Sequence, residues 1–264
     1  MTRSSATPEY DDSFVERLEM MWGEGFLSPG GAEEVRLILA GEDFSGKRVL
    51  DIGCGAGGAE LLLVREFNAE KVIGIDVVPQ LVGRARRLCR EAGLARRIEV
   101  KTVKPGRLPF KNTAFDVVFT KDALLHVADK AGIFGEIHRI LRPGGLFVGS
   151  DWLAGENIDR CSAWARFIEL RRPSFVMTSA AGMTEAMHRA KLERICLTDR
   201  NTWFADVAAC DLRNVEGPLR NSLGRLLGEA GYDDWISVRR AIAGAAVSGA
   251  LRPTHMRAFK PGPG

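Results

Sequence analysis

The sequence predicts an α/β fold: a mostly parallel, seven-stranded sheet with helices on both faces and a helical insertion. Two observations carry this prediction. Strand and helix patterns alternate along the chain from residue 48 onward, and a glycine-rich turn follows the first strand pattern. Strict alternation of strands and helices is typical of parallel sheets covered on both faces.

Seven short apolar runs have the length and composition of strands. They span residues 48–52, 71–75, 98–103, 115–120, 145–151, 193–198 and 254–259. Apolar residues at helical spacing predict helices over 11–22, 32–40, 58–67, 79–92 and 129–140. Asp11 and Asp12 can cap the first of these helices.

The length of 264 residues suits one large α/β domain. We expect a helical cap over 1–44, a ligand-binding core over 45–151, and a C-terminal part of the sheet over 192–264. Between core and C-terminal part, residues 152–191 carry two helical stretches with breaks at Pro173 and Gly182. We expect this insertion to form a lid.

The composition argues against several classes of protein. Hydrophobic residues make up 45% of the chain and charged residues 27%, which is ordinary for a globular domain. There is no 18-residue apolar run and no signal-like N-terminus, so we expect a cytoplasmic protein without membrane contact. The net charge of +3 is too small to indicate nucleic acid. Five cysteines without a C-x-x-C pair suggest no metal site.

The turn after the first predicted strand reads Asp-x-Gly-x-Gly-x-Gly, from Asp51 to Gly57. Glycines allow the backbone to turn sharply and to approach a ligand closely. Asp76 ends the next apolar run and can accept hydrogen bonds from both hydroxyls of a ribose. Ligands bind beyond the carboxyl ends of such strands, so we expect these groups to border one pocket.

A further pair of candidates follows the fourth predicted strand, where Asp122 and His126 lie four residues apart. On a helical turn the two side chains would share a face. A carboxylate beside a histidine favours the imidazolium and orients the ring. A helix cap at Asp122 and a packed histidine are the alternative interpretation.

The glycine turn resembles motif I of the class I S-adenosylmethionine (SAM) methyltransferases, which implies a Rossmann-like fold with SAM bound by the core. A narrower resemblance lies in three segments: Trp-Gly-Glu-Gly-Phe-Leu-Ser-Pro-Gly-Gly from residue 22, Asp-Ala-Leu-Leu-His-Val-x-Asp-Lys from residue 122, and Leu-Arg-Pro-Gly-Gly from residue 141 followed by Ser-Asp-Trp. These resemble the phosphoethanolamine N-methyltransferases, over roughly residues 10–152.

The resemblance implies roles for individual residues. Tyr10 and His126 would form a catalytic pair that latches the site and deprotonates an amine, and Asp122 would either orient the pair or contact the acceptor amine. The cofactor would contact a larger set: Ser28, Gly30, Gly31, Asp51, Gly53, Gly55, Asp76, Val77, Thr102, Val103 and Lys121.

The sequence departs from that family at the residues that would bind the acceptor and at the residue that would bind the adenine of the cofactor. Thr102 stands where the family usually has an aspartate for the adenine amino group. Trp152 replaces a tyrosine, and a tryptophan can stack on a cation but cannot donate a hydroxyl hydrogen bond. Arg171 aligns with the phosphate-binding arginine, Phe167 replaces a tyrosine, and Arg239 lies beside the position of a clamping lysine. An arginine fork can also bind a carboxylate.

Several functions therefore stay open. We expect a SAM-dependent methyltransferase of a small polar or zwitterionic acceptor, as a monomer or homodimer. A phosphoethanolamine-type amine competes with glycine, sarcosine, dimethylglycine or the thioether of methionine. A methyltransferase of RNA or protein would need a basic groove or an added domain, which the chain lacks. The third alternative is a SAM-binding protein without catalysis.

Overall fold

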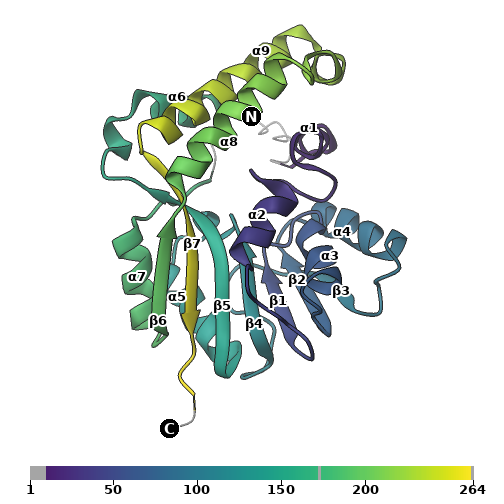
Figure 1. Ribbon diagram of the computed structural model, residues 1–264, viewed down its shortest axis with the longest axis vertical. Helices are drawn as coiled ribbons and strands as arrows, with labels where there is room; N and C mark the ends of the chain where they lie inside the picture. Colours follow the sequence, from purple (N-terminus) through teal and green to yellow (C-terminus); the bar gives the residue numbers. More distant parts are fainter. Residues whose placement is uncertain (1–9, 172–173, 263–264) are drawn as a thin grey trace, which may run out of the picture.

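A computed structural model describes residues 10–171 and 174–262 of the protein (Figure 1). One seven-stranded sheet has the order β3-β2-β1-β4-β5-β7-β6. Strands β1 to β5 pair in parallel, and β7 lies antiparallel between β5 and β6. The strands span Arg48–Ile52, Lys71–Asp76, Ile98–Thr102, Phe115–Lys121, Leu141–Ala154, Glu193–Asp199 and Leu251–Phe259, numbered β1 to β7. The predicted sheet is confirmed.

Helices cover both faces of the sheet because its central strands are apolar on both sides. On one face, α2 (Gly31–Ile38), α3 (Gly58–Arg65) and α4 (Pro79–Glu91) pack against a cluster that includes Val49. On the other face, α5 (Lys130–Ile140) and α7 (Ala180–Arg189) pack against a cluster that includes Leu50. Neighbouring residues of β1 thus serve opposite faces, as the alternation of strand side chains requires.

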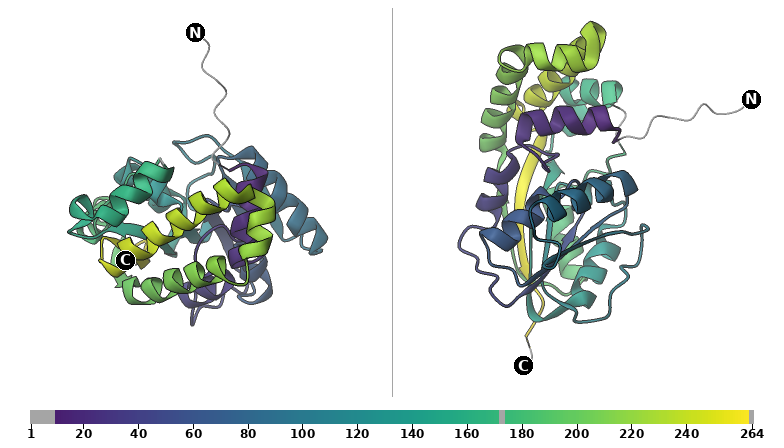
Figure 2. Two further views of the ribbon diagram at one scale, coloured as in Figure 1. Left: turned by 90° about the horizontal axis from the view of Figure 1, so that it is seen from above. Right: turned by 90° about the vertical axis from the view of Figure 1, so that its right-hand side faces the viewer.

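Four helices form a separate layer above one end of the sheet (Figures 1 and 2). They are α1 (Asp12–Trp22), α6 (Ser162–Arg171), α8 (Asn201–Glu216) and α9 (Arg220–Val247). Two apolar clusters hold them together, one between α1, α8 and α9 and the other between α6, α8 and α9. We call this layer the helical cap from here on. Of the cap expected over 1–44, it contains α1, whereas α2 packs against the sheet.

The insertion departs from the prediction. Only its first helix, α6, belongs to the helical cap, whereas α7 packs beside α5 against the sheet. Gly182 does not break a helix but lies in the first turn of α7, and Pro173 lies outside the described residues. Residues 192–264 contribute two cap helices, α8 and α9, as well as strands. That residues 152–191 form a lid stays a prediction.

Two short 3-10 turns complete the described part of the chain, Leu124–His126 after β4 and Ile158–Arg160 after β5. None of the described helices is long and apolar enough to cross a bilayer.

The close approach of α1 to α2 generates a first prediction. Gly31 has a φ of +47°, and a Cβ there would collide with the Trp22 carbonyl oxygen. Gly41 has a φ of +82° but open space around it. Alanine at either position costs about 1 kcal/mol of backbone strain. We expect Gly31→Ala to lower the free energy of unfolding by a further ~1–3 kcal/mol because of the collision, measured by urea unfolding. Equal losses of unfolding free energy in Gly31→Ala and Gly41→Ala would contradict the close contact between Gly31 and the Trp22 carbonyl oxygen.

Candidate active site

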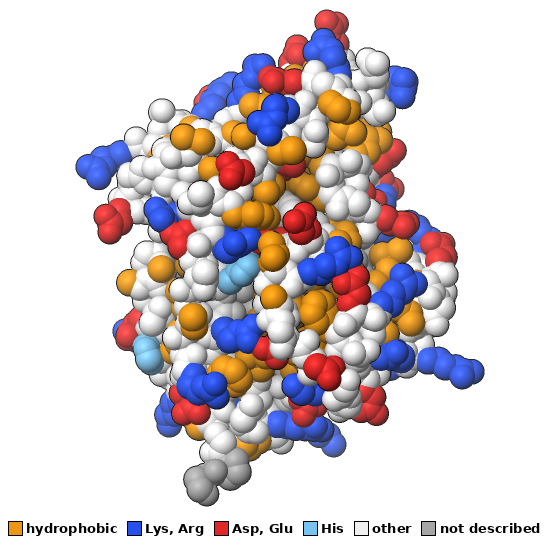
Figure 3. Space-filling model, in the orientation of Figure 1, with side chains coloured by type: hydrophobic (Ala, Val, Ile, Leu, Met, Phe, Trp, Pro, Cys, Tyr) orange, Lys and Arg blue, Asp and Glu red, His pale blue; other side chains and the backbone are white. Residues whose placement is uncertain are grey.

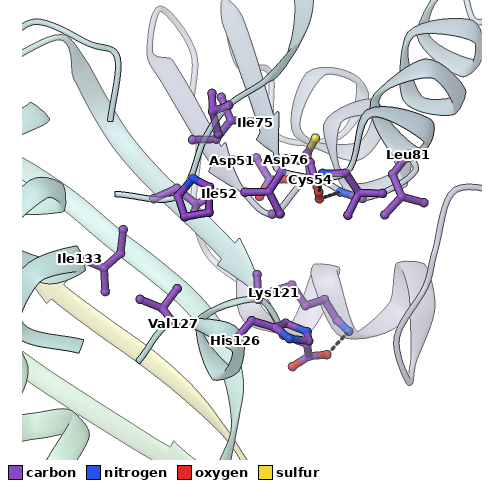
Figure 4. Close-up of a pocket in the computed structure, with 18 of the residues that line it drawn as sticks. Asp51, Ile52, Cys54, Ile75, Asp76, Leu81, Lys121, His126, Val127 and Ile133 are labelled. Atoms are coloured by element: carbon purple, nitrogen blue, oxygen red, sulfur yellow. Dashed lines mark hydrogen bonds and ion pairs between the residues drawn. The ribbon is translucent and has the colours of Figure 1, made fainter. Parts of the chain in front are cut away.

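A cavity of about 920 Å³ opens at the carboxyl ends of β1, β2 and β4. Figure 3, in the orientation of Figure 1, shows apolar side chains gathered across the middle of the molecule, between the helical cap and the sheet. Within the cavity, Asp76 and Cys54 lie on one wall, with Lys121 and His126 on the opposite wall (Figure 4). The cavity is therefore built from loops that leave neighbouring parallel strands.

The glycine turn is fixed to the tip of β2 by main-chain hydrogen bonds. The amides of Gly53 and Cys54 donate to the Ile75 carbonyl at 2.8 and 3.1 Å. The Gly55 amide donates to the Asp76 carboxylate at 3.0 Å. Gly53, Gly55 and Gly57 have φ values of 78°, 53° and 98°, which side chains rarely allow. The backbone conformation of the turn therefore needs a glycine at each of these three positions.

Asp76 is held rigidly at the cavity wall. Its second carboxylate oxygen accepts from the Val78 amide at 2.8 Å, and the residue is 9% exposed. Burial raises the pKa of Asp76 above its usual value, while the amides of Val78, Gly55 and Val77 and the charge of His126 oppose this rise. A pre-positioned acidic acceptor at this place suits a ribose diol.

The segment before α2 covers the glycine turn. The Gly58 amide donates to the Gly25 carbonyl at 3.1 Å, and Leu27 contacts the position of Gly55. Lys121 fastens the same segment to β4, since its ammonium donates to Ser28 Oγ at 2.5 Å and to the Pro29 carbonyl at 3.1 Å. The Lys121 ammonium also donates to the Asp122 carboxylate at 2.8 Å. These three hydrogen bonds within the protein compete with the predicted contact of Lys121 to the cofactor.

The structure brings most of the predicted cofactor residues to this cavity. Its lining includes Ser28, Asp51, Gly53, Gly55, Asp76, Val77, Val103 and Lys121.

Three predicted cofactor residues lie outside the lining. Gly31 is needed for its contact with α1, and Gly30 precedes α2 with a φ of 79° and no room for a Cβ beside Trp203, so packing explains both glycines. Thr102 is exposed, whereas the next two residues, Val103 and Lys104, line the cavity. An apolar and a basic residue thus form the cavity wall after β3.

A smaller chamber of about 100 Å³ adjoins the cavity. The two share five residues, among them the three predicted catalytic residues: Tyr10, Leu27, Ser28, Asp122 and His126. The four predicted acceptor-binding residues all line the chamber: Trp152, Phe167, Arg171 and Arg239. Sequence reasoning missed three aromatic residues of its wall, Phe14, Trp22 and Phe175. Phe14 and Trp22 could have been found, because Phe14, Leu18 and Trp22 recur every four residues on one apolar face of the helix predicted over 11–22.

His126 lies at the junction of cavity and chamber. Its Nδ1 is 3.2 Å from Ser174 Oγ, and its ring meets Phe175 edge to face at 5.1 Å between centroids. The expected helical turn from 122 to 126 does not form, because Asp122 has a φ of 52° and the 3-10 turn begins at Leu124. The Asp122 carboxylate instead accepts from Lys121 and from Ser150 Oγ, the latter at 3.3 Å.

The far end of the chamber is cationic. Arg239 is 7% exposed and stacks on Trp235, 4.2 Å from its ring centroid. Burial lowers the pKa of Arg239 to about 10, against the raising effect of Asp211, and the charges of Arg171 and Arg17 lower it further. Burial also lowers the pKa of Arg17. The guanidinium groups of Arg17, Arg171 and Arg239 thus repel one another, and Asp211 attracts that of Arg239.

Beneath the glycine turn lies a pair of buried acids, Asp51 and Glu60, which are 2% and 0% exposed. Burial disfavours the charged form of both acids. It raises the pKa of Glu60 to about 7, although its own amide, Cys54 and Asp51 oppose the rise. Burial and the nearby Glu60 and Asp76 charges raise the pKa of Asp51 well above its usual range.

Comparison with known proteins fits this geometry. A family model described as a methyltransferase domain matches residues 43–198, which is more than half of the chain. The chain belongs to the methyltransferase domain family. Its match covers the glycine turn, Asp76, His126 and β1 to β6.

Curated relatives of this methyltransferase domain include phosphoethanolamine N-methyltransferase 3 of Arabidopsis thaliana, 29% identical over 209 residues. That alignment covers 79% of this chain and 41% of the plant protein, so the chain spans about two fifths of its relative's length. A 24-methylenesterol C-methyltransferase 2 of Oryza sativa is 36% identical over 169 residues, covering 58% of this chain and 46% of that protein.

Solved structures share the fold. Phosphoethanolamine N-methyltransferase 2 of Haemonchus contortus, in complex with phosphomonomethylethanolamine and S-adenosylhomocysteine, has a TM-score of 0.87 at 22% identity over 96% of this chain and 59% of that chain. A putative sarcosine dimethylglycine methyltransferase of Galdieria sulphuraria has a TM-score of 0.77 at 19% identity, covering 95% and 97%.

The buried acids generate a prediction about pH. The Glu60 carboxyl releases its proton near pH 4.5 when unfolded but only near pH 7 when folded. The free energy of unfolding therefore falls as pH rises through this window, by up to about 1.4 kcal/mol per pH unit for one proton. We expect Glu60→Gln to remove this part of the decline, measured by urea unfolding between pH 5 and 8. Glu91→Gln, at an exposed position of α4, is the control. Parallel pH profiles for wild type and Glu60→Gln would contradict the shift.

Proposed function

We propose that this protein transfers a methyl group from SAM to the nitrogen of a small amine that carries an anionic group, of the phosphoethanolamine type. One observation carries the proposal. The chamber beside the cavity has Tyr10, His126 and Asp122 at its entrance, and Arg171 and Arg239 in its wall. An acceptor can therefore be held by its anion while its nitrogen faces the cavity.

The residues of the large cavity fit SAM. Asp76 suits the ribose hydroxyls, and the backbone of the glycine turn leaves room for the methionine part. Apolar side chains, among them Val77, Val103 and Ile133, suit the base. SAM supplies the reactive methyl group when bound, and the protein has to align the acceptor with it and exclude water.

The cationic end of the chamber supports an anionic acceptor group. Arg171 and Arg239 both line the chamber, and the charges of Arg171 and Arg17 lower the pKa of Arg239 against the raising effect of Asp211. A phosphate or carboxylate bound there would interact favourably with these positive charges, and planar guanidinium groups bind both in bidentate fashion. The aromatic wall formed by residues such as Phe14, Trp152 and Phe175 can stabilise a methylated ammonium in the same chamber.

An ammonium must lose a proton before it can accept a methyl group. His126 lies at the entrance with Nδ1 beside Ser174, and Tyr10 lines the same entrance. We assign proton removal to these two residues, because an imidazole titrates near neutral pH and a phenol oxygen can relay the proton. Asp122 would keep the local charge balanced between Lys121 and the acceptor ammonium.

A second candidate is an amino-acid-like acceptor, such as glycine, sarcosine, dimethylglycine or the thioether of methionine. The loss of family tyrosines at Trp152 and Phe167 supports it, because fewer hydroxyl donors are left for a phosphate. A sterol acceptor fits less well, because Arg171 and Arg239 place charged groups in the wall of a small chamber of about 100 Å³.

An acceptor assay tests the proposal. We expect formation of S-adenosylhomocysteine with phosphoethanolamine or its methylated derivatives, detected by mass spectrometry. Arg171→Met should raise the acceptor KM about 10–100-fold, because a charge-assisted hydrogen bond contributes about 1.5–3 kcal/mol. The matched control is Arg166→Met, an exposed arginine of the same helix that pairs with Glu169. Turnover of glycine or methionine in place of the phosphate ester would favour the second candidate, and no turnover of any acceptor would reject both.

Replacing the assigned base separates amines from thioethers. With an amine acceptor, His126→Asn should lower kcat about 10²–10⁴-fold and change the pH profile of kcat/KM near neutral pH. Tyr10→Phe should also lower kcat. A thioether has no proton to lose, so both losses should then be small. An amine-methylating enzyme whose pH profile is the same in wild type and His126→Asn would refute the assignment.

A further inference from the structure

Lys130 is the first residue of α5 and makes an unusual set of hydrogen bonds. Its ammonium donates to the carbonyl oxygens of Leu124 at 2.8 Å, Val127 at 2.5 Å and Val176 at 2.9 Å. A lysine has three donors, so all of them are used on main-chain acceptors. The side chain therefore acts as a three-way link between two segments of the chain.

This placement of a cation is costly by itself. A positive charge at the N-terminus of a helix opposes the helix dipole, which favours acidic residues there. Burial lowers the pKa of Lys130, against the raising effect of the Asp151 charge. Helix formation thus does not explain why a lysine begins α5. The three hydrogen bonds to carbonyl oxygens offset this cost. The role of the lysine therefore lies in the two segments of main chain that these hydrogen bonds hold together.

The carbonyls that Lys130 binds lie on either side of His126 and of its ring contacts. Leu124 and Val127 bracket His126 in the 3-10 turn and the residue after it. Val176 follows Ser174 and Phe175, both of which contact the His126 ring. The Val176 amide also donates to the Leu125 carbonyl at 2.7 Å, which closes the link between the two segments.

We propose that Lys130 is a positioning residue for methyl transfer, which fixes the His126 imidazole by holding the main chain on both sides of it together with the segment of Ser174 and Phe175. The inference rests on the proposed function, because the catalytic role of His126 does. A planar arginine fork cannot reproduce three divergent contacts from one nitrogen, so charge alone does not suffice.

The first test reads the imidazole directly and needs no turnover. The chain has four histidines, and ¹³C-labelled histidine gives one ring signal for each. The His126 signal is assigned with His126→Asn. We expect Lys130→Met to shift and broaden the His126 signal while the signals of His138, His188 and His255 stay unchanged. The exposed Lys111→Met is the control and should leave all four in place. An unchanged His126 signal in Lys130→Met would overturn the proposal.

The second test uses a double-mutant cycle. Lys130→Met should lower kcat tenfold or more, while the dissociation constant for SAM, measured by calorimetry, changes less than threefold. In the His126→Asn background the same substitution should have little further effect, because the lysine acts through the histidine. The proposal would be overturned if the loss of kcat in the double variant equalled the product of the losses in the two single variants.

A milder variant guards against loss of folding. Lys130→Arg keeps the charge and most of the stem, so it should fold and give an intermediate loss of kcat with the same dependence on His126. Full activity of Lys130→Arg with an unmoved His126 signal would overturn the proposal. A shifted His126 signal without turnover of any acceptor by wild type would instead reject the proposed function and leave the positioning role intact.

Discussion

The site depends on the close approach of the segment before α2 to the glycine turn. Gly25 and Gly58 have room for hydrogen atoms only, since a Cβ on Gly25 would lie 2.8 Å from the Gly58 backbone. The Gly58 amide donates to the Gly25 carbonyl across this contact, and Lys121 fastens the next residues of the segment to β4. These contacts bring Tyr10 and α1 over the strand ends. Without them the cavity would lack its cover and the chamber one of its walls.

The two ends of the site carry opposite charges. The carboxylate of Asp76 lies in the wall of the large cavity beside the glycine turn, whereas the guanidinium groups of Arg171 and Arg239 line the chamber. A cationic sulfonium donor suits the acidic end, and an anionic acceptor group suits the basic end. His126 lies between them, where the reacting atoms of such a pair would meet.

Burial strengthens this arrangement because charges interact more strongly where water is excluded. The same burial makes unpaired charge expensive, which is why the pKa of Glu60 rises and that of Arg239 falls. A bound anion would add a further counter-charge beside Arg239, whose pKa burial lowers although Asp211 opposes this shift.

The sequence by itself determined the order of the strands and of the helices before residue 192, the glycine turn and the position of Asp76, because periodicity and turn chemistry are local properties. It also identified Tyr10, His126, Arg171 and Arg239 through resemblance, and all four line the chamber. It did not predict that α6, α8 and α9 join α1 in one cap, since packing between helices distant in the chain leaves no local pattern. Tertiary structure alone decided that Lys130 links Val176 to the turn of His126, and that packing rather than a ligand explains Gly31.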